Sequence, residues 1–220
     1  MNDANVGAFF ATLRAANPQP RTELEYTSVF ELLAAVLLSA QATDIGVNKA
    51  TRRLFLVANT PAAIVALGLD ALTEQIRSIG LFRTKAKNLL ATSRILIELH
   101  GARVPRSREA LEALPGVGRK TANVVLNVAF GEPTMAVDTH IFRVGNRTGL
   151  APGTTPLAVE HKLLERVPIE YLVDAHHWLI LHGRYVCQAR RPLCEQCRVA
   201  RYCDAAPRFL AERLIALPAS

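Results

Sequence analysis

The apolar residues of this chain recur with a helical period along most of its length. Within residues 29–40 they stand at the first position and then three, four, seven, eight and eleven positions later, which places them on one face of an α-helix. Similar apolar faces run through residues 86–97, 122–129 and 172–179. No segment shows the alternation of a half-buried strand. The pattern therefore predicts an all-α fold of about ten short helices joined by short loops.

The sequence also indicates where several of these helices begin and end. Ser28 with Glu31 three residues later has the spacing of a capping box, which predicts a helix start. Gly101 and Gly131 follow apolar faces, as glycines commonly do after the last helical turn. By the same argument, Gly183 is expected to end the helix that begins near residue 172.

Composition narrows the class of protein. The 220 residues suffice for a large core in one domain or two. Lys and Arg number 26 against 19 Asp and Glu, a formal charge of +7 that is consistent with a polyanionic partner. No apolar run reaches the ~18 residues of a membrane span. The first residues also lack the basic and apolar regions of a secretory signal, so we expect neither a membrane segment nor secretion.

A turn with two closely spaced glycines joins two of the predicted helices. It reads Leu-Pro-Gly-Val-Gly-Arg-Lys-Thr over residues 114–121. Gly116 and Gly118 allow a sharp turn and a close approach of the backbone to a partner. The helix that follows offers unpaired N–H groups and the positive end of its dipole, which together suit a phosphate. The spacing excludes a Walker A loop. An ordinary connection between packed helices is the alternative.

Lys120 stands in the first turn of that helix, beside the positive end of the dipole. The dipole disfavours an ammonium group there, and partial burial would act in the same direction. A lysine in such a place is a candidate nucleophile of the kind that forms Schiff bases. A solvated surface lysine is the alternative, and position alone does not decide between the two.

The sequence of residues 136–143 predicts a short apolar stretch, then an aspartate that caps a new helix. Asp138 is the expected cap. A carboxylate at a helix start stays ionised and can stabilise positive charge on a reacting sugar or orient a proton transfer. A purely structural cap is the alternative. His140 is expected to be packed rather than catalytic.

The four cysteines of the chain all lie within its last fifth. They are Cys187, Cys194, Cys197 and Cys203, with the spacing C-x6-C-x2-C-x5-C. Disulfides are disfavoured because a chain of this size needs no such links and carries no secretory signal. Zinc sites commonly use two close pairs, whereas only one is present here. A [4Fe–4S] cluster suits four thiolates, although the spacing matches neither common ferredoxin pattern. From the spacing, iron–sulfur and zinc remain equally open.

Taken together, these features resemble the endonuclease III family, bacterial base-excision-repair enzymes of the helix–hairpin–helix superfamily. The resemblance rests on the hairpin at residues 114–121, the segment Val137–His140, and the four cysteines, in that order. Further similar stretches are residues 38–44, 79–81 and 177–184. The ordered set is specific and covers essentially the whole chain to Cys203.

The resemblance implies two docked helical domains. One, residues 22–132, would be a central bundle that carries the helix–hairpin–helix motif. The other would be discontinuous, formed by residues 1–21 and 133–220, and would carry the C-terminal cluster loop. The active site would lie in the cleft between them, with Lys120 and Asp138 facing each other across it.

The resemblance also implies roles for individual residues. Lys120 would be the nucleophile and Asp138 its carboxylate partner. The four cysteines would ligate a [4Fe–4S] cluster, which decides between iron and zinc in favour of iron. Gln41 and Leu81 match loop residues that enter the duplex and fill the space of an extruded nucleotide. For these two, ordinary loop packing is the alternative.

Other DNA contacts would come from the hairpin and from arginines near the cysteines. These positions are Gly116, Val117, Gly118, Arg119, Thr121, Arg184, Arg190 and Arg191. A cluster that holds the segment between Cys187 and Cys194 in place would present its arginines to phosphates. A solvated basic surface is the alternative.

The implied activity is that of a bifunctional DNA glycosylase and AP lyase. Its substrate would be duplex DNA with oxidised pyrimidines or abasic sites, and the damaged nucleotide would be flipped out of the duplex. Lys120 would displace the base through a Schiff base, and β-elimination would nick the strand on the 3′ side. The enzyme would act as a monomer in the bacterial cytoplasm.

Two other interpretations compete with this one. An adenine-removing relative shares the cysteines and the aspartate but usually lacks the hairpin lysine and carries an extra C-terminal domain, so Lys120 argues for a bifunctional rather than a monofunctional glycosylase. A non-catalytic helix–hairpin–helix DNA-binding module would need no carboxylate like Asp138. Such a module would show salt-sensitive affinity without nicking damaged duplex.

Overall fold

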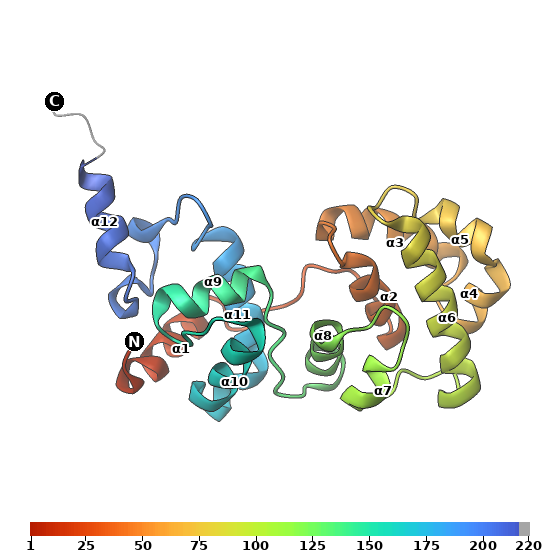
Figure 1. Cartoon of the computed structure of the whole chain (residues 1–220), viewed down its shortest axis with the longest axis horizontal. Coiled ribbons are helices and arrows are strands. Elements are labelled where there is room, and N and C mark those ends of the chain that lie inside the picture. The colour runs from red at the N-terminus through yellow and green to blue at the C-terminus, as the bar shows by residue number, and fades with distance from the viewer. Residues whose placement is uncertain (216–220) are drawn as a thin grey trace. The chain divides into compact units, whose positions relative to one another are not determined.

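The computed structural model describes residues 1–215, and side chains through residue 212, and every regular element in that range is helical (Figure 1). The α-helices are α1 (Asp3–Ala16), α2 (Val29–Ser39), α3 (Asp44–Val57), α4 (Pro61–Leu67), α5 (Leu69–Gln75), α6 (Phe82–His100), α7 (Arg108–Glu112), α8 (Arg119–Phe130), α9 (Thr139–Thr148), α10 (Pro156–Arg166), α11 (Leu172–Tyr185) and α12 (Ala206–Ile215). Short 3₁₀ helices are η1 (Ile169–Tyr171), η2 (Cys194–Gln196) and η3 (Ala200–Tyr202). The predicted all-α fold is confirmed. Among the described helices, none is long and apolar enough to cross a membrane.

The chain divides into two compact units. The central unit is Thr22–Glu132, and the terminal unit combines Met1–Arg21 with Pro133–Ser220. Each unit has its own hydrophobic core. The hairpin belongs to the central unit, and the cysteine segment belongs to the terminal unit.

Helix α2 forms the middle of the central unit. Its apolar residues are buried on every face, and it packs against α3, α6 and α8. A helix that is hydrophobic all round is one that neighbours cover on all sides. Helices α4 and α5 pack on α6, and α7 packs on α8. This arrangement supports both ends of the hairpin between α7 and α8.

The start of α2 uses the predicted cap with one change. The Ser28 side chain accepts a hydrogen bond from the Glu31 N–H at 3.1 Å, as expected. The Glu31 carboxylate, however, accepts from the Thr27 N–H and from the Thr27 hydroxyl, at 2.8 Å for the hydroxyl. Glu31 is only 3 % exposed, so its two bonds to Thr27 satisfy a buried charge and fix the chain one residue before the cap.

In the terminal unit, α9 packs against α11 and α10, and α1 packs against α11. Aromatic rings fill the space beside α1, where Phe10 stacks on Tyr171 and lies 6.3 Å from Trp178, ring centre to ring centre. The Trp178 Nε1–H donates to the carbonyl oxygen of Asn17 at 2.8 Å. The end of α1 is therefore joined to α11 by both apolar packing and a hydrogen bond.

The prediction that Gly183 ends a helix is wrong. Helix α11 continues through Gly183 to Tyr185. A Cβ at Gly183 would lie 2.8 Å from the Cβ of His140 and 3.2 Å from its carbonyl oxygen. Glycine is required there because α9 approaches α11 closely, and not because the helix turns. Gly101 and Gly131 do end α6 and α8, both in the left-handed conformation.

Candidate active site and cysteine centre

The hairpin between α7 and α8 is a tight turn held by the central unit. The Val117 N–H donates to the carbonyl oxygen of Leu114 at 3.0 Å, and the Val117 side chain is buried. From α6, the Thr92 hydroxyl donates to the carbonyl oxygen of Pro115 at 3.1 Å. Since its N–H is already used and its side chain is packed, Val117 shapes the turn and has no donor left to offer a phosphate.

The two glycines of the hairpin have different structural requirements. Gly116 has a φ of +79°, and a Cβ added to it would lie 2.6 Å from Nδ2 of Asn88. Gly118 has an ordinary φ of −96° and meets no atom within 4 Å of an added Cβ. The fold therefore requires glycine at position 116 only, and the open space at Gly118 is available to an approaching ligand.

This difference allows folding to be separated from binding. Gly116→Ala is expected to lower the free energy of unfolding by about 1–3 kcal/mol, through the positive φ and the contact with Asn88. Gly118→Ala should cost under about 1 kcal/mol but weaken affinity for duplex DNA, because its methyl group occupies the space open to a phosphate. Urea unfolding and fluorescence anisotropy measure the two effects. Unchanged DNA affinity in Gly118→Ala would argue against a phosphate contact at this turn.

The first turn of α8 follows the hairpin directly. Gly118 is the N-cap and provides no side-chain hydrogen bond to the N–H groups that follow it. Arg119 and Thr121 are half-buried, whereas Lys120 is exposed. The partial burial that would add to the effect of the dipole on Lys120 is therefore not found. Its ammonium group makes no ion pair or hydrogen bond with the residues that the structure describes.

Gln41 and Leu81 lie in two adjacent loops of the central unit. Both are exposed, Leu81 to 58 %, and both have a positive φ, 53° and 59° respectively. An added Cβ at Gly80 would lie 4.0 Å from the carbonyl oxygen of Gln41, so the two loops are in contact. Left-handed backbone at a non-glycine residue is costly and is concentrated at functional sites. The sequence did not reveal this shared conformation.

Asp138 caps α9 in the terminal unit. Its Oδ1 accepts hydrogen bonds from the N–H groups of His140 and Ile141, both at 2.8 Å. Its Oδ2 makes no hydrogen bond within the described residues, and the side chain is only half-buried. One carboxylate oxygen therefore orients the group, while the other is available to a reactant. His140 is half-buried beside α11, consistent with the expected packing role.

The four cysteines line one apolar cavity of the terminal unit. Its other walls include Val186, Leu193, Val199 and Ala206. Burial raises the pKa of the Cys197 thiol to about 11 and also raises that of Cys203. A thiolate here therefore needs a positive partner.

The same cavity supplies the donor atoms for such a partner. Four thiols that line one cavity are a donor set used by both structural zinc sites and iron–sulfur clusters.

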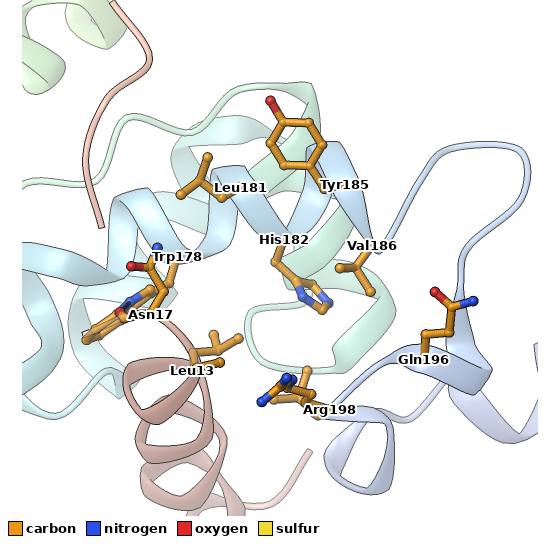
Figure 2. A pocket seen from close by; sticks show the side chains of 11 residues that line it. Leu13, Asn17, Trp178, Leu181, His182, Tyr185, Val186, Gln196 and Arg198 are labelled. Carbon is orange, nitrogen blue, oxygen red and sulfur yellow. Dashed lines mark hydrogen bonds between the residues drawn. The ribbon is translucent and has the colours of Figure 1, made fainter. Parts of the chain in front are cut away.

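A second pocket of about 420 Å³ adjoins this cavity (Figure 2). It is lined by the end of α1, by α11 and by the segment around Gln196 and Arg198. The buried His182 ring lines both pockets, and its Nε2 lies 3.8 Å from Sγ of Cys197. Burial lowers the pKa of His182 to about 4, so a neutral imidazole separates the two spaces at neutral pH.

The arginines near the cysteines differ in their surroundings. Arg190 and Arg191 are exposed between Cys187 and Cys194, whereas Arg184 is half-buried at the end of α11. The sequence did not indicate a role for Arg147, a half-buried residue of α9 that donates hydrogen bonds to the carbonyl groups of Gln188 and Ala189. Arg143 and Arg147 are one helical turn apart, which predicts that they share a face of the helix. Spacing alone could not show which segment of the chain that face contacts.

Comparisons with known proteins agree with these features. Residues 34–169 match the model of the HhH-GPD superfamily base excision DNA repair proteins. Endonuclease III of Haemophilus influenzae is 62 % identical over 204 residues, which are 93 % of this chain and 97 % of that protein. Endonuclease III of Escherichia coli strain K12 is 60 % identical over the same shares of the two chains. A solved structure of a trapped endonuclease III–DNA covalent intermediate superposes with a TM-score of 0.89 at 42 % identity, covering 96 % of this chain and 99 % of that one.

Proposed function

This chain belongs to the endonuclease III family of base excision DNA repair proteins, and on that premise we propose how its residues divide the chemistry. The enzyme is a DNA glycosylase and AP lyase that acts on duplex DNA. Its substrates, in this proposal, are oxidised pyrimidines and abasic sites. Since that DNA is chromosomal, the enzyme works in the bacterial cytoplasm.

Lys120 is the nucleophile. The observation that carries this assignment is its place: it follows the hairpin directly, in the first turn of α8, with its side chain exposed and unpaired within the described residues. Its deprotonated amine attacks C1′ of an extruded nucleotide, the C1′–N bond breaks, and the base leaves with a proton. The C1′–O4′ bond then opens and the attached nitrogen loses a proton, which gives an iminium at C1′. The iminium acidifies the C2′ proton, whose loss expels the 3′ phosphate by β-elimination.

Asp138 stabilises the positive charge that builds on the sugar as the base departs. Asp138→Asn is expected to slow base release by about 10²–10⁴-fold, the usual worth of such a group. Asparagine also caps helices well, so the variant should keep α9 and its thermal stability. Single-turnover base release and a thermal melt provide the two readouts. A wild-type rate in this variant would reduce Asp138 to a structural cap.

Gln41 and Leu81 enter the duplex where the nucleotide leaves it. Their exposure and strained backbone support this assignment, because a side chain that replaces a base must project from a rigid loop. Leu81 supplies an apolar wedge between bases, and Gln41 has an amide that can hydrogen-bond to a base. Both lie in the same unit as the hairpin, which holds the phosphates.

A [4Fe–4S] cluster occupies the cysteine cavity. The support is the chemistry of the donor set, four thiols that line one apolar cavity, in a chain of the endonuclease III family. Cys187, Cys194, Cys197 and Cys203 would hold the cluster, which would link the segments that carry them. None of the steps at the sugar passes through it.

The function is tested with a duplex that carries one oxidised pyrimidine. The enzyme should release the base and cut that strand only, leaving the unsaturated 3′ aldehyde end of β-elimination. An undamaged duplex of the same sequence is the control. Base release without a cut strand would indicate a monofunctional glycosylase, and binding without base release would indicate a DNA-binding module.

A further inference from the structure

The segment between the first two cysteines is a short loop closed by its own backbone. We define the basic loop as Gln188–Leu193. The N–H groups of Gln188 and Leu193 both donate to the carbonyl oxygen of Val186, at 2.9 Å each. Arg190 and Arg191 lie at its tip, exposed and with no hydrogen bond or ion pair in the part of the chain that the structure describes.

Arg147 holds the beginning of this loop. Its Nη1 donates to the carbonyl oxygen of Gln188 at 2.7 Å, and its Nη2 donates to that of Ala189 at 2.6 Å. The two nitrogens of one planar guanidinium thus bind two successive carbonyl oxygens, immediately before Arg190. Such a fork fixes a backbone direction in a way that a single ammonium cannot.

Arg147 is itself fixed from the other side. Its guanidinium carbon lies 4.9 Å from the ring centre of Phe209. Its backbone carbonyl accepts a hydrogen bond from the Ala205 N–H at 3.0 Å. The backbone of Arg147 is therefore tied to the start of α12 and its side chain is packed against Phe209, so the residue is fixed where it meets the basic loop.

We propose that Arg147 is a positioning residue that holds the basic loop in the conformation in which Arg190 and Arg191 meet DNA phosphates. It acts through those two arginines and does not touch DNA. Ligation of Cys187 and Cys194 fixes the ends of the loop, but the carbonyl groups of Gln188 and Ala189 depend on Arg147. The inference rests on the proposed activity on duplex DNA and on the expectation from the sequence that Arg190 and Arg191 contact its phosphates.

A double-mutant cycle on the cluster-loaded protein tests the proposal. The probe is a duplex with one tetrahydrofuran abasic-site analogue, and affinity is measured at several salt concentrations. Replacing Arg190 and Arg191 together by Gln should lower affinity and reduce the salt slope by up to about 2, since each phosphate that is no longer neutralised lowers the slope by about 0.9. In an Arg147→Gln background, replacing Arg190 and Arg191 by Gln should lower the logarithm of the DNA affinity by at most a third of the decrease seen in wild type.

Two further variants separate position from charge. Arg147→Lys keeps the charge but loses the fork, so it should behave like Arg147→Gln. Arg201→Gln is the matched control, because Arg201 is exposed in the same segment and lies 4.7 Å over the Tyr202 ring without a hydrogen bond among the described residues. In the Arg201→Gln background, replacing Arg190 and Arg191 should lower DNA affinity as much as it does in wild type. Full additivity with Arg147→Gln would overturn the proposal.

Iron content and hydrogen exchange distinguish the ways in which the proposal can fail. The Arg147 variants should keep wild-type iron content while the amides of Gln188 and Leu193, which both donate to the carbonyl oxygen of Val186, exchange at least ten-fold faster. Loss of iron from both variants would make Arg147 a cluster-assembly residue and overturn the proposal. If replacing Arg190 and Arg191 leaves wild-type affinity unchanged, the proposed DNA contact fails instead, and unchanged exchange in the variants would reject the positioning role separately.

Discussion

Replacing Lys120 with alanine is expected to abolish strand nicking while leaving affinity for an abasic-site duplex nearly unchanged. Without the amine no iminium forms at C1′, and the C2′ proton loses the activation that β-elimination requires. Removing a covalent nucleophile commonly costs more than about 10³-fold in rate. Because the Lys120 ammonium is exposed and unpaired among the described residues, the substitution should not disturb the fold.

Borohydride trapping measures this directly. Wild type, mixed with a duplex that carries one abasic site and then reduced, should yield a covalent protein–DNA adduct, and Lys120→Ala should yield none. Lys120→Arg keeps the positive charge without a comparable nucleophile, so it should bind DNA and still form no adduct. Lys87→Ala removes another exposed lysine of the central unit and should behave as wild type. An adduct of normal yield with Lys120→Ala would place the nucleophile elsewhere.

The second large effect is expected for Cys197→Ser. The variant should lose most of its iron and the brown colour of the cluster, and its unfolding temperature should fall by about 10 °C, as expected when a few kcal/mol are lost from a chain of this size. The physical reason is that the cysteine segment contains only short 3₁₀ turns and few buried residues. Without its fourth ligand the short turns η2 and η3 lose the cluster that joins them.

A matched control tests whether any new hydroxyl group in this cavity would have the same effect. Ala200 lines the same cavity but is not a sulfur ligand, so Ala200→Ser should retain iron and most of the stability. Iron and acid-labile sulfide assays, with a thermal melt, give the readouts. A stable Cys197→Ser protein that contains zinc, or one that keeps wild-type iron, would contradict the cluster assignment.

The sequence predicted those features that depend on neighbours along the chain. The start of α2 at Ser28, the ends of α6 and α8 at Gly101 and Gly131, and the cap at Asp138 each involve groups a few residues apart. Their local chemistry is the same in any fold that contains the helix. The ordered motifs also pointed to the family, because the hairpin, the aspartate and the four cysteines stand at specific places in one chain.

Prediction failed where a residue serves a distant segment. Gly183 has the local appearance of a helix end, yet it lies inside α11. Glycine is needed there because His140, 43 positions earlier, leaves no room for a Cβ. Arg147 was not recognised because its two acceptors are 41 and 42 residues away. Whether Lys120 is buried or exposed was left open by its helix position, because burial depends on what surrounds a side chain.

The sequence by itself therefore determined the helical class, the helix caps, the residue types of the hairpin and cysteine segment, and through them the family. Only the tertiary structure decided which glycine of the hairpin the fold requires, that Gln41 and Leu81 share a strained backbone in adjacent loops, and that Arg147 holds the basic loop. The reason is physical. Backbone hydrogen bonding and capping act between near neighbours in sequence, whereas packing and long-range hydrogen bonds depend on segments that only the complete fold brings together.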